Sequence, residues 1–257
     1  MKKLKTIRSL SRKLFLSVFF VGSSVGWGSV LQAQQIVEGL SCLDGSPVSV
    51  EIAEGKIVRV QPLKKLSDER QAVYIAPGLI DNQVNGFAGV SFTFGGSELT
   101  AEGVRKATRE LWKKGVTSYL PTLTTNSREV LLKNFTILAG AKNDPALRGS
   151  IPGFHLEGPF ISSVDGYRGA HPLKYVRKPD WQEFLDLYEA SGRAILTVTV
   201  APEQDGAMEF IRRCTEMGVT VALGHHNAGR AVVDQAVLNG ACVATHLGNG
   251  CANMINR

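Results

Sequence analysis

The sequence predicts an α/β fold: an incomplete (β/α)8 barrel of about six strand–helix units, preceded by a few strands of a smaller unit. From Tyr74 onward, apolar runs typical of buried strands alternate with stretches whose apolar residues recur at helical spacing. Strands that are apolar on both faces and alternate with helices form parallel sheets. A long series of such units favours a barrel over an open sheet. The first strand is not followed by Gly-x-Gly-x-x-Gly, which argues against a dinucleotide-binding fold.

Residues 1–33 have the pattern of an export signal. The basic stretch MKKLKTIRSLSRK precedes the apolar stretch LFLSVFFVGSSVGWGSVL, and the small residue Ala33 stands before Gln34. Glycine and serine interrupt the apolar stretch, which is short for a bilayer span of about 20 residues. We therefore expect a signal peptide, a periplasmic or secreted protein, and no stable membrane insertion. An uncleaved anchor is the alternative, and the protein is cytoplasmic if the leader does not function.

The net charge of +6 does not indicate nucleic-acid binding. The leader contains six basic residues and no acidic ones, so the rest of the chain is formally neutral. A neutral surface offers no general attraction for the phosphate backbone of DNA or RNA. Cysteines without metal-binding or redox spacing are expected to be core or loop thiols. This applies to Cys214, Cys242 and Cys251, whereas Cys42 lies too far downstream of the leader to be a lipid-attachment cysteine.

Residues 34–75 are predicted to form short strands. Apolar and polar residues alternate in VSVEIAEGKIVRVQPL, and Glu54-Gly55 within it is typical of a tight turn. So few strands cannot bury a core of their own. We therefore expect this segment to be part of a small unit that packs against something else.

Residues 76–257 are predicted to form the barrel. The strand-like runs lie at 74–85, 116–125, 150–159, 194–203, 219–227 and 241–249. The helix-like stretches lie at 100–113, 127–142, 180–190, 204–217 and 228–239. Four helices are followed by a glycine, which favours the left-handed conformation at a helix end: Gly115, Gly192, Gly218 and Gly240. A closed barrel has two more strands, so we expect either a fragment or an incomplete barrel that finds its missing strands elsewhere.

Unusual polar residues stand at the ends of the predicted strands, where parallel-barrel enzymes carry their chemistry. They are Asp81, Gln83, Asn85, Thr124, Thr125, Asn126, His155, Glu157, Glu203, His225, His226, Asn227, His246 and Asn249. A glutamate and two histidines from three strand ends, Glu157, His225 and His246, suit a divalent metal such as Zn²⁺ or Fe²⁺. The alternative is that each is a hydrogen-bonded core or loop residue. His226 is expected to be structural or to support the site, and His155 either shares the face of Glu157 or packs in the core.

Several motifs together resemble the N-acetylglucosamine-6-phosphate deacetylases of the amidohydrolase superfamily. They are PGLIDNQVNG, HLEGPF followed by GAHP, TVAPE, GHHNA and ATHLGNG, and the resemblance extends over about residues 36 to 257. The resemblance implies the TIM barrel of metal-dependent hydrolases, with a small β-sandwich built from both ends of the chain. It implies that residues 34–75 contribute to the sandwich and residues 76–257 to the barrel.

The resemblance also implies roles for individual residues. Glu157, His225 and His246 match the metal ligands of the family. Ala170 and His171 match the loop that contacts the sugar and its acetamido group. Asn249 and Gly250 match positions that contact the substrate, its phosphate included, and Arg257 matches a phosphate-binding arginine. Where many amidohydrolases have His-x-His for a second metal, this sequence has Gln83-Val84-Asn85, and amides are poor zinc ligands. We therefore expect one divalent metal ion.

The implied reaction is hydrolysis of the acetamide of N-acetylglucosamine 6-phosphate to glucosamine 6-phosphate and acetate. The family places its general-base aspartate at the end of strand eight, beyond the six strands predicted here. Asp81 and Glu203 are nearest in type but stand at other positions, so we assign no catalytic residue and expect the printed chain to be inactive. The expected partner is a small amino-sugar substrate. The sequence leaves the oligomeric state open, although members of this family are commonly homodimers.

Three alternatives remain at this stage. An exported amidohydrolase would act on a different N-acetyl amino sugar, including an unphosphorylated one. Another amidohydrolase, such as a cyclic amidase or an N-acyl-amino-acid hydrolase, is disfavoured by GAHP and by the Gln-x-Asn of the first strand. A non-catalytic protein would bind metal or sugar without turnover.

Overall fold

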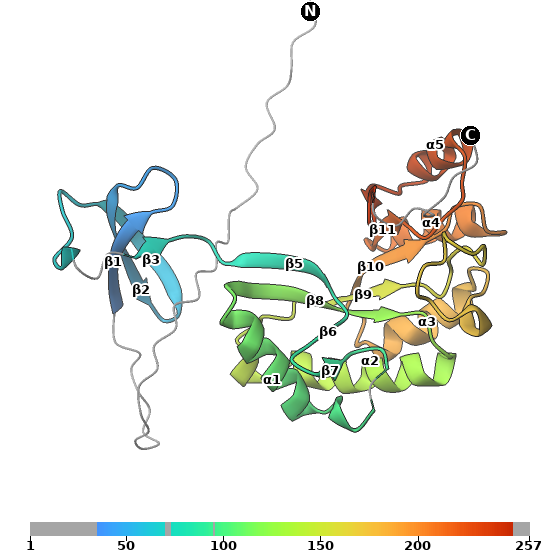
Figure 1. The fold of residues 1–257 in the computed structure, drawn as a ribbon, viewed down its shortest axis with the longest axis horizontal. Coiled ribbons are helices and arrows are strands. Elements are labelled where there is room, and N and C mark those ends of the chain that lie inside the picture. The colour runs from blue at the N-terminus through green and yellow to red at the C-terminus, as the bar shows by residue number, and fades with distance from the viewer. Residues whose placement is uncertain (1–34, 70–72, 95, 249–257) are drawn as a thin grey trace, which may run out of the picture. The chain divides into compact units, whose positions relative to one another are not determined.

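The computed structural model describes residues 35–69, 73–94 and 96–248 (Figure 1). The chain divides into two compact units, one ending at Leu79 and the other beginning at Ile80. The predicted leader, residues 1–33, lies outside the described residues. Within the described ranges, no helix combines the length and the apolar character that a membrane span requires.

The first unit is a four-stranded sheet in the order β3-β2-β1-β4. Its strands are β1 (Gln35–Ser41), β2 (Pro47–Ala53), β3 (Lys56–Pro62) and β4 (Tyr74–Ile75). Glu54 and Gly55 form the predicted turn between β2 and β3, and both have the positive φ that tight hairpins favour, 51° and 70°. Val50 is buried, whereas Val58 and Val60 on β3 are exposed, so this sheet buries little apolar surface by itself.

The second unit contains a six-stranded sheet in the order β12-β11-β10-β9-β8-β5. Its strands are β5 (Leu79–Val84), β8 (Val116–Thr124), β9 (Phe154–Glu157), β10 (Ile195–Val200), β11 (Thr220–Leu223) and β12 (Val243–Ala244). The pairs from β8 to β12 are all parallel, and the strand order follows the chain order, as in a (β/α) barrel. The unit is therefore the predicted incomplete barrel. The hairpin of β6 (Gly86–Phe87) and β7 (Val90–Ser91) after β5 was not predicted.

Helices connect these strands, and α1, α2 and α3 pack in succession along one face of the sheet (Figure 1). The helices are α1 (Ala101–Trp112), α2 (Arg128–Lys142), α3 (Trp181–Ala190), α4 (Ala207–Glu216) and α5 (Arg230–Leu238), with short 3₁₀ turns at Gly96–Glu98, Pro145–Leu147 and Leu173–Tyr175. The side chains of Thr100, Ser127 and Asp180 cap the first three helices by accepting a backbone N–H of the first turn. The four glycines predicted to end helices all have positive φ.

The observed strands are shorter than the predicted runs, most clearly β9, β11 and β12. The run 150–159 contains only β9, and the run 241–249 contains only β12. Pro159 has no N–H to donate to a strand ladder, which limits β9 at its end. Just before β9, Gly153 lies against Ala194, the residue that precedes β10: a Cβ at Gly153 would be 2.5 Å from the Ala194 carbonyl oxygen.

The core lies between the sheet and the helices. Its largest fully buried side chains include Phe135 of α2, Phe154 of β9 and Phe184 of α3, and aromatic contacts join Phe135 to Phe154. Each such ring contributes roughly 1.5–3 kcal/mol by leaving water. Cys214 is a buried thiol of this core, as expected, and burial raises its pKa to about 12. This packing holds the strands in register and so brings their carboxyl ends, with the polar residues, to one edge.

Candidate metal centre

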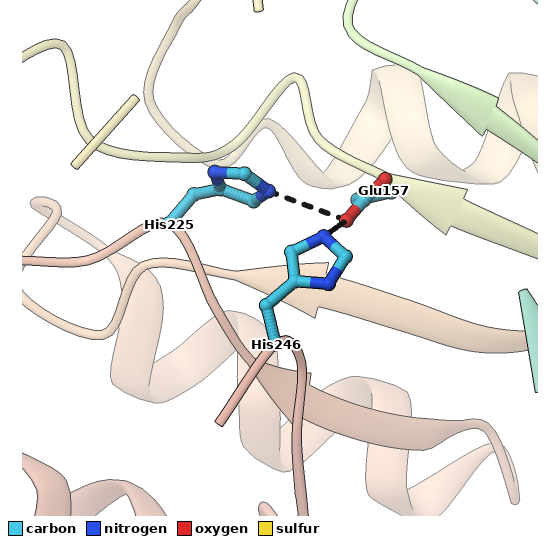
Figure 2. A group of neighbouring side chains, drawn as sticks. All are labelled: Glu157, His225 and His246. Carbon is cyan, nitrogen blue, oxygen red and sulfur yellow. Dashed lines mark hydrogen bonds and ion pairs between the residues drawn. The ribbon is translucent and has the colours of Figure 1, made fainter. Parts of the chain in front are cut away.

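The three predicted ligands meet at the carboxyl ends of the strands (Figure 2). Glu157 is the last residue of β9, His225 follows β11, and His246 follows β12. The Oε1 atom of Glu157 lies 3.3 Å from Nε2 of His225 and 2.8 Å from Nε2 of His246. One ligand atom from each of the three lies within 4.8 Å of the others. A single ion therefore fits between a carboxylate and two imidazoles, a donor set typical of zinc or iron.

Both histidines occupy an unusual backbone conformation. The φ angle is 52° at His225 and 56° at His246, in the left-handed region that residues other than glycine enter rarely. Such a conformation costs roughly 1–3 kcal/mol and persists only where the surroundings impose it. The N–H of Ser162 donates to the carbonyl of His225 at 2.9 Å, and the N–H of Thr245 donates to Leu223 O at 2.8 Å. These bonds hold the two turns that place the imidazoles beside Glu157.

The surroundings of Nδ1 show which nitrogen of the neutral His225 ring carries the hydrogen. Nδ1 lies 3.1 Å from the carbonyl oxygen of Tyr167, which can only accept, so Nδ1 carries a hydrogen. In the neutral ring, Nε2 then presents a lone pair to the Glu157 carboxylate. Two acceptors at this distance repel each other unless a proton or a metal ion lies between them. A histidine that binds a metal through Nε2 usually donates its Nδ1–H to a carbonyl or carboxylate in this way.

Glu157 is ionised in this environment although its side chain is only 1% exposed. Burial by itself raises the pKa of Glu157, but the contact with His225 and the neighbouring imidazoles together outweigh burial and lower the pKa from 4.5 to about 2. A buried carboxylate is costly unless positive charge compensates it. The residues around Glu157 are therefore arranged for a cation.

His171 lies directly beside the three residues. Its ring centroid is 4.3 Å from that of His225, and burial, followed by the charge of His225, lowers its pKa from 6.5 to about 4. The backbone N–H of Thr125 points at Nδ1 from 3.4 Å and its hydroxyl lies 2.7 Å away, so the neutral ring carries its proton on Nε2. Arg168 donates to the carbonyl of His171 at 2.6 Å and holds this loop in place. The neighbouring Ala170 is exposed.

A pocket of about 500 Å³ opens beside the site. His246 lines it together with Gln83 and Asn85 of the first barrel strand and the loop that follows. Asp81 also lines the pocket, and its Oδ1 accepts the backbone N–H of Gln83 at 3.0 Å. Gln83 and Asn85 therefore line the same space as His246, and residues of their type can hydrogen-bond a polar molecule.

Other predicted residues hold the loops or lie outside the described ranges. β11 ends at Leu223, so His226 is not a strand residue, and its Nδ1 accepts the N–H of Ala228 in the turn. Glu203 accepts the N–H of Asn227 at 2.7 Å and so braces the same turn. The predicted substrate-binding residues Asn249, Gly250 and Arg257 lie outside the described residues.

Packing in the core was one of the two roles expected for His155, whereas Thr199, Thr245 and the Tyr167 carbonyl, which also support the site, were not identified from the sequence. His155 is a buried core histidine whose Nε2 lies 2.8 Å from Thr199 Oγ1, and Thr199 in turn lies 2.8 Å from Thr245 Oγ1. Threonine is an ordinary strand residue, so its presence in a run such as TVTV carries no signal of a role. The Tyr167 carbonyl carries none either, because any residue supplies one.

No family model matches the chain. N-acetylglucosamine-6-phosphate deacetylase of Bos taurus is 38% identical over 191 residues, which are 72% of this chain and 46% of the relative. A solved N-acetyl-D-glucosamine-6-phosphate deacetylase from Mycobacterium smegmatis, an aspartate-to-alanine mutant in complex with N-acetyl-D-glucosamine-6-phosphate, superposes with a TM-score of 0.74 at 29% identity. The superposition covers 88% of this chain and 58% of that one. The chain is a homologue of the N-acetylglucosamine-6-phosphate deacetylases.

The match is partial with respect to these deacetylases. The chain spans about half the length of the curated relatives it matches. An N-acetylgalactosamine-6-phosphate deacetylase of Escherichia coli O157:H7 is 28% identical over 228 residues, covering 89% of this chain and 58% of the relative. The homology confirms the predicted resemblance, and the deacetylase structures confirm the predicted barrel.

Proposed function

We propose that the protein is a metal-dependent deacetylase of N-acetylglucosamine 6-phosphate and that Glu157, His225 and His246 hold its metal ion. The carrying observation is the approach of these three side chains, whose ligand atoms all lie within 4.8 Å of one another. The homology to deacetylases supports the reaction, which releases glucosamine 6-phosphate and acetate.

One divalent ion, Zn²⁺ or Fe²⁺, fits this site better than two. Gln83 at the end of the first barrel strand and Asn85 just after it line the adjoining pocket, and amides bind these metals weakly compared with imidazole. When bound, such an ion polarises the acetyl carbonyl and lowers the pKa of a water ligand.

The protein's own residues orient the substrate. His171 carries a proton on Nε2 beside the ligands, which suits it to donate a hydrogen bond to the acetamido group. Gln83 and Asn85 line the space that a sugar would occupy. Asn249, Gly250 and Arg257 are proposed to bind the sugar phosphate, which a guanidinium meets with two parallel hydrogen bonds. We assign the general base neither to Asp81 nor to Glu203, because each accepts a backbone N–H within the fold.

A second substrate is N-acetylgalactosamine 6-phosphate, favoured by the Escherichia coli relative. A third is an unphosphorylated N-acetyl amino sugar, favoured by the export pattern of residues 1–33. Acetate release from these three compounds separates the possibilities. The proposal predicts the highest kcat/KM for N-acetylglucosamine 6-phosphate, and a preference for either of the others would overturn this choice of substrate.

The ligand assignment is tested by metal content and turnover in the intact protein. Purified protein is expected to carry one zinc or iron per chain by elemental analysis. Glu157→Gln keeps the shape of the side chain but removes its charge, so it should lose the stoichiometric metal and the release of acetate. Glu189→Gln is the matched control, because Glu189 is an exposed carboxylate on α3 that pairs with Arg193. Retention of metal by Glu157→Gln would refute the assignment.

We further propose that the protein is exported and forms a homodimer. The basic, apolar and small-residue order of residues 1–33 supports export. Amino-terminal sequencing of the protein from fractionated cells should find it outside the cytoplasm with its leader removed. A cytoplasmic protein that keeps its leader would refute export. Light scattering at several concentrations tests the dimer, and a constant monomer mass would refute it.

A further inference from the structure

We propose that Thr199 and Thr245 are positioning residues that fix the turn carrying His246. This inference rests on the proposed metal centre, because it concerns how one of its ligands is held. The two threonines belong to different strand ends, and their hydroxyl oxygens lie 2.8 Å apart. The hydroxyl of Thr199 also lies 2.8 Å from Nε2 of His155.

These contacts form a hydrogen-bonded row that crosses the sheet. His155 lies on β9, two residues before Glu157, and Thr199 lies on the neighbouring strand β10. Thr245 directly precedes His246. The row thus joins the strand that carries Glu157 to the turn that carries His246. It therefore sets the relative position of two groups whose ligand atoms are 2.8 Å apart.

The row passes over β11, which lies between β10 and β12 in the sheet. Gly224, just after β11, makes this possible. A Cβ at Gly224 would lie 2.6 Å from Thr245 Cβ and 2.9 Å from Thr199 Cγ2, distances at which carbon atoms overlap. A side chain at this position would therefore push the two threonines apart. Because glycine has no side chain, the hydroxyls of the two threonines can approach each other next to Gly224.

His246 is the proposed ligand that most needs such support. Its side chain is 34% exposed, against 7% for His225 and 1% for Glu157. It follows β12, which is two residues long and lies at the end of the six-stranded sheet. Its backbone has a φ of 56°, which other contacts must impose. The Thr245 hydroxyl supplies a contact to the fully buried Thr199, in addition to the backbone bond from Thr245 to Leu223.

The test is the affinity of the intact protein for Zn²⁺, measured by competition with a chelator. Thr199→Val and Thr245→Val remove a hydroxyl while keeping the branched shape. Substitution of a residue that orients a metal ligand typically weakens metal affinity about 10- to 100-fold. We expect the dissociation constant to rise at least tenfold in both variants and to return toward the wild-type value in Thr199→Ser and Thr245→Ser, which retain the hydroxyl.

Thr215→Val is the matched control. The Thr215 hydroxyl donates within its own helix, α4, to Ile211 O at 2.9 Å. This variant loses the same chemical group in the same unit, so it should bind Zn²⁺ like the wild type. The melting temperature of each metal-free protein separates loss of stability from loss of positioning. An equal rise in dissociation constant in Thr215→Val would overturn the inference.

The double variant provides a further check. Thr199→Val and Thr245→Val both break the bond between the two hydroxyls, so the double variant should bind no more weakly than Thr199→Val alone. Additive losses would overturn the inference, as would wild-type affinity in both single variants. If Thr199→Val does not fold, the half-buried Thr245→Val decides the matter alone. Failure of the wild-type protein to bind Zn²⁺ would instead overturn the proposed function.

Discussion

Acidification is expected to destabilise the metal-free protein through His155. This ring is 3% exposed, and burial, opposed in part by the charge of Glu157, lowers its pKa from 6.5 to about 4. The unfolded chain therefore binds the proton more tightly than the folded protein does. The stability that neutral His155 contributes is fully present above about pH 6.5 and is lost as the pH falls through about 4.

The size of this effect follows from the pKa difference. A gap of about 2.5 pKa units, at about 1.4 kcal/mol per unit, corresponds to about 3 kcal/mol. His155→Gln removes the titrating group and leaves an amide that can still bond Thr199. Between pH 7 and pH 4, the free energy of unfolding of the wild-type protein should fall by about 3 kcal/mol more than that of His155→Gln.

Urea denaturation of the chelator-treated proteins at several pH values measures this difference. The pKa of His171 is also lowered, but its contribution is common to both proteins and cancels in the comparison. His226→Gln is the control, because this half-buried ring lies in the turn after β11. Parallel curves of unfolding free energy against pH for the wild-type protein and His155→Gln would refute the reasoning.

Two further substitutions, each compared with a second variant, test side-chain packing and charge pairing by urea denaturation. A Cβ at Gly158, where φ is 81°, would lie 2.2 Å from Thr125 Oγ1, so Gly158→Ala should cost about 3 kcal/mol of stability. Gly218→Ala, at a φ of 79° in open space, should cost only about 1 kcal/mol, and equal losses would contradict the role of the overlap. Arg177→Met should cost about 2 kcal/mol, because it leaves the 9% exposed Glu183 carboxylate without its guanidinium partner. Adding Glu183→Leu should recover part of that loss, and no recovery would count against this explanation.

The helices were predictable from local sequence, whereas the lengths of the strands were not. The capping side chains of Thr100, Ser127 and Asp180 and the glycines after the helices are local signals, and the predicted helices lie within a few residues of the observed ones. Pro159 limits the end of β9 locally, but the start of β9 and the length of β12 depend on neighbouring segments and on position in the sheet. Short strands depend on their partners, so periodicity alone overestimates them.

The candidate ligands were predictable because parallel strands bring their ends together. Glu157, His225 and His246 were therefore identified before their distances were known. The left-handed turns of the two histidines were not predictable, since non-local bonds from Ser162 and Thr245 impose them. The threonine row depends on a glycine from a third strand end, a coincidence that only the folded sheet reveals. The substrate contacts of Asn249, Gly250 and Arg257 stay predictions.

Anomalous diffraction from crystals of the intact protein, recorded on both sides of the zinc and iron absorption edges, tests the metal centre most directly. The account predicts one strong anomalous peak per chain, in direct contact with Oε1 of Glu157 and Nε2 of His225 and His246. The absorption edge at which the peak appears identifies the metal. A metal-loaded crystal without a peak between these three atoms, or with its peak on other residues, would contradict the account.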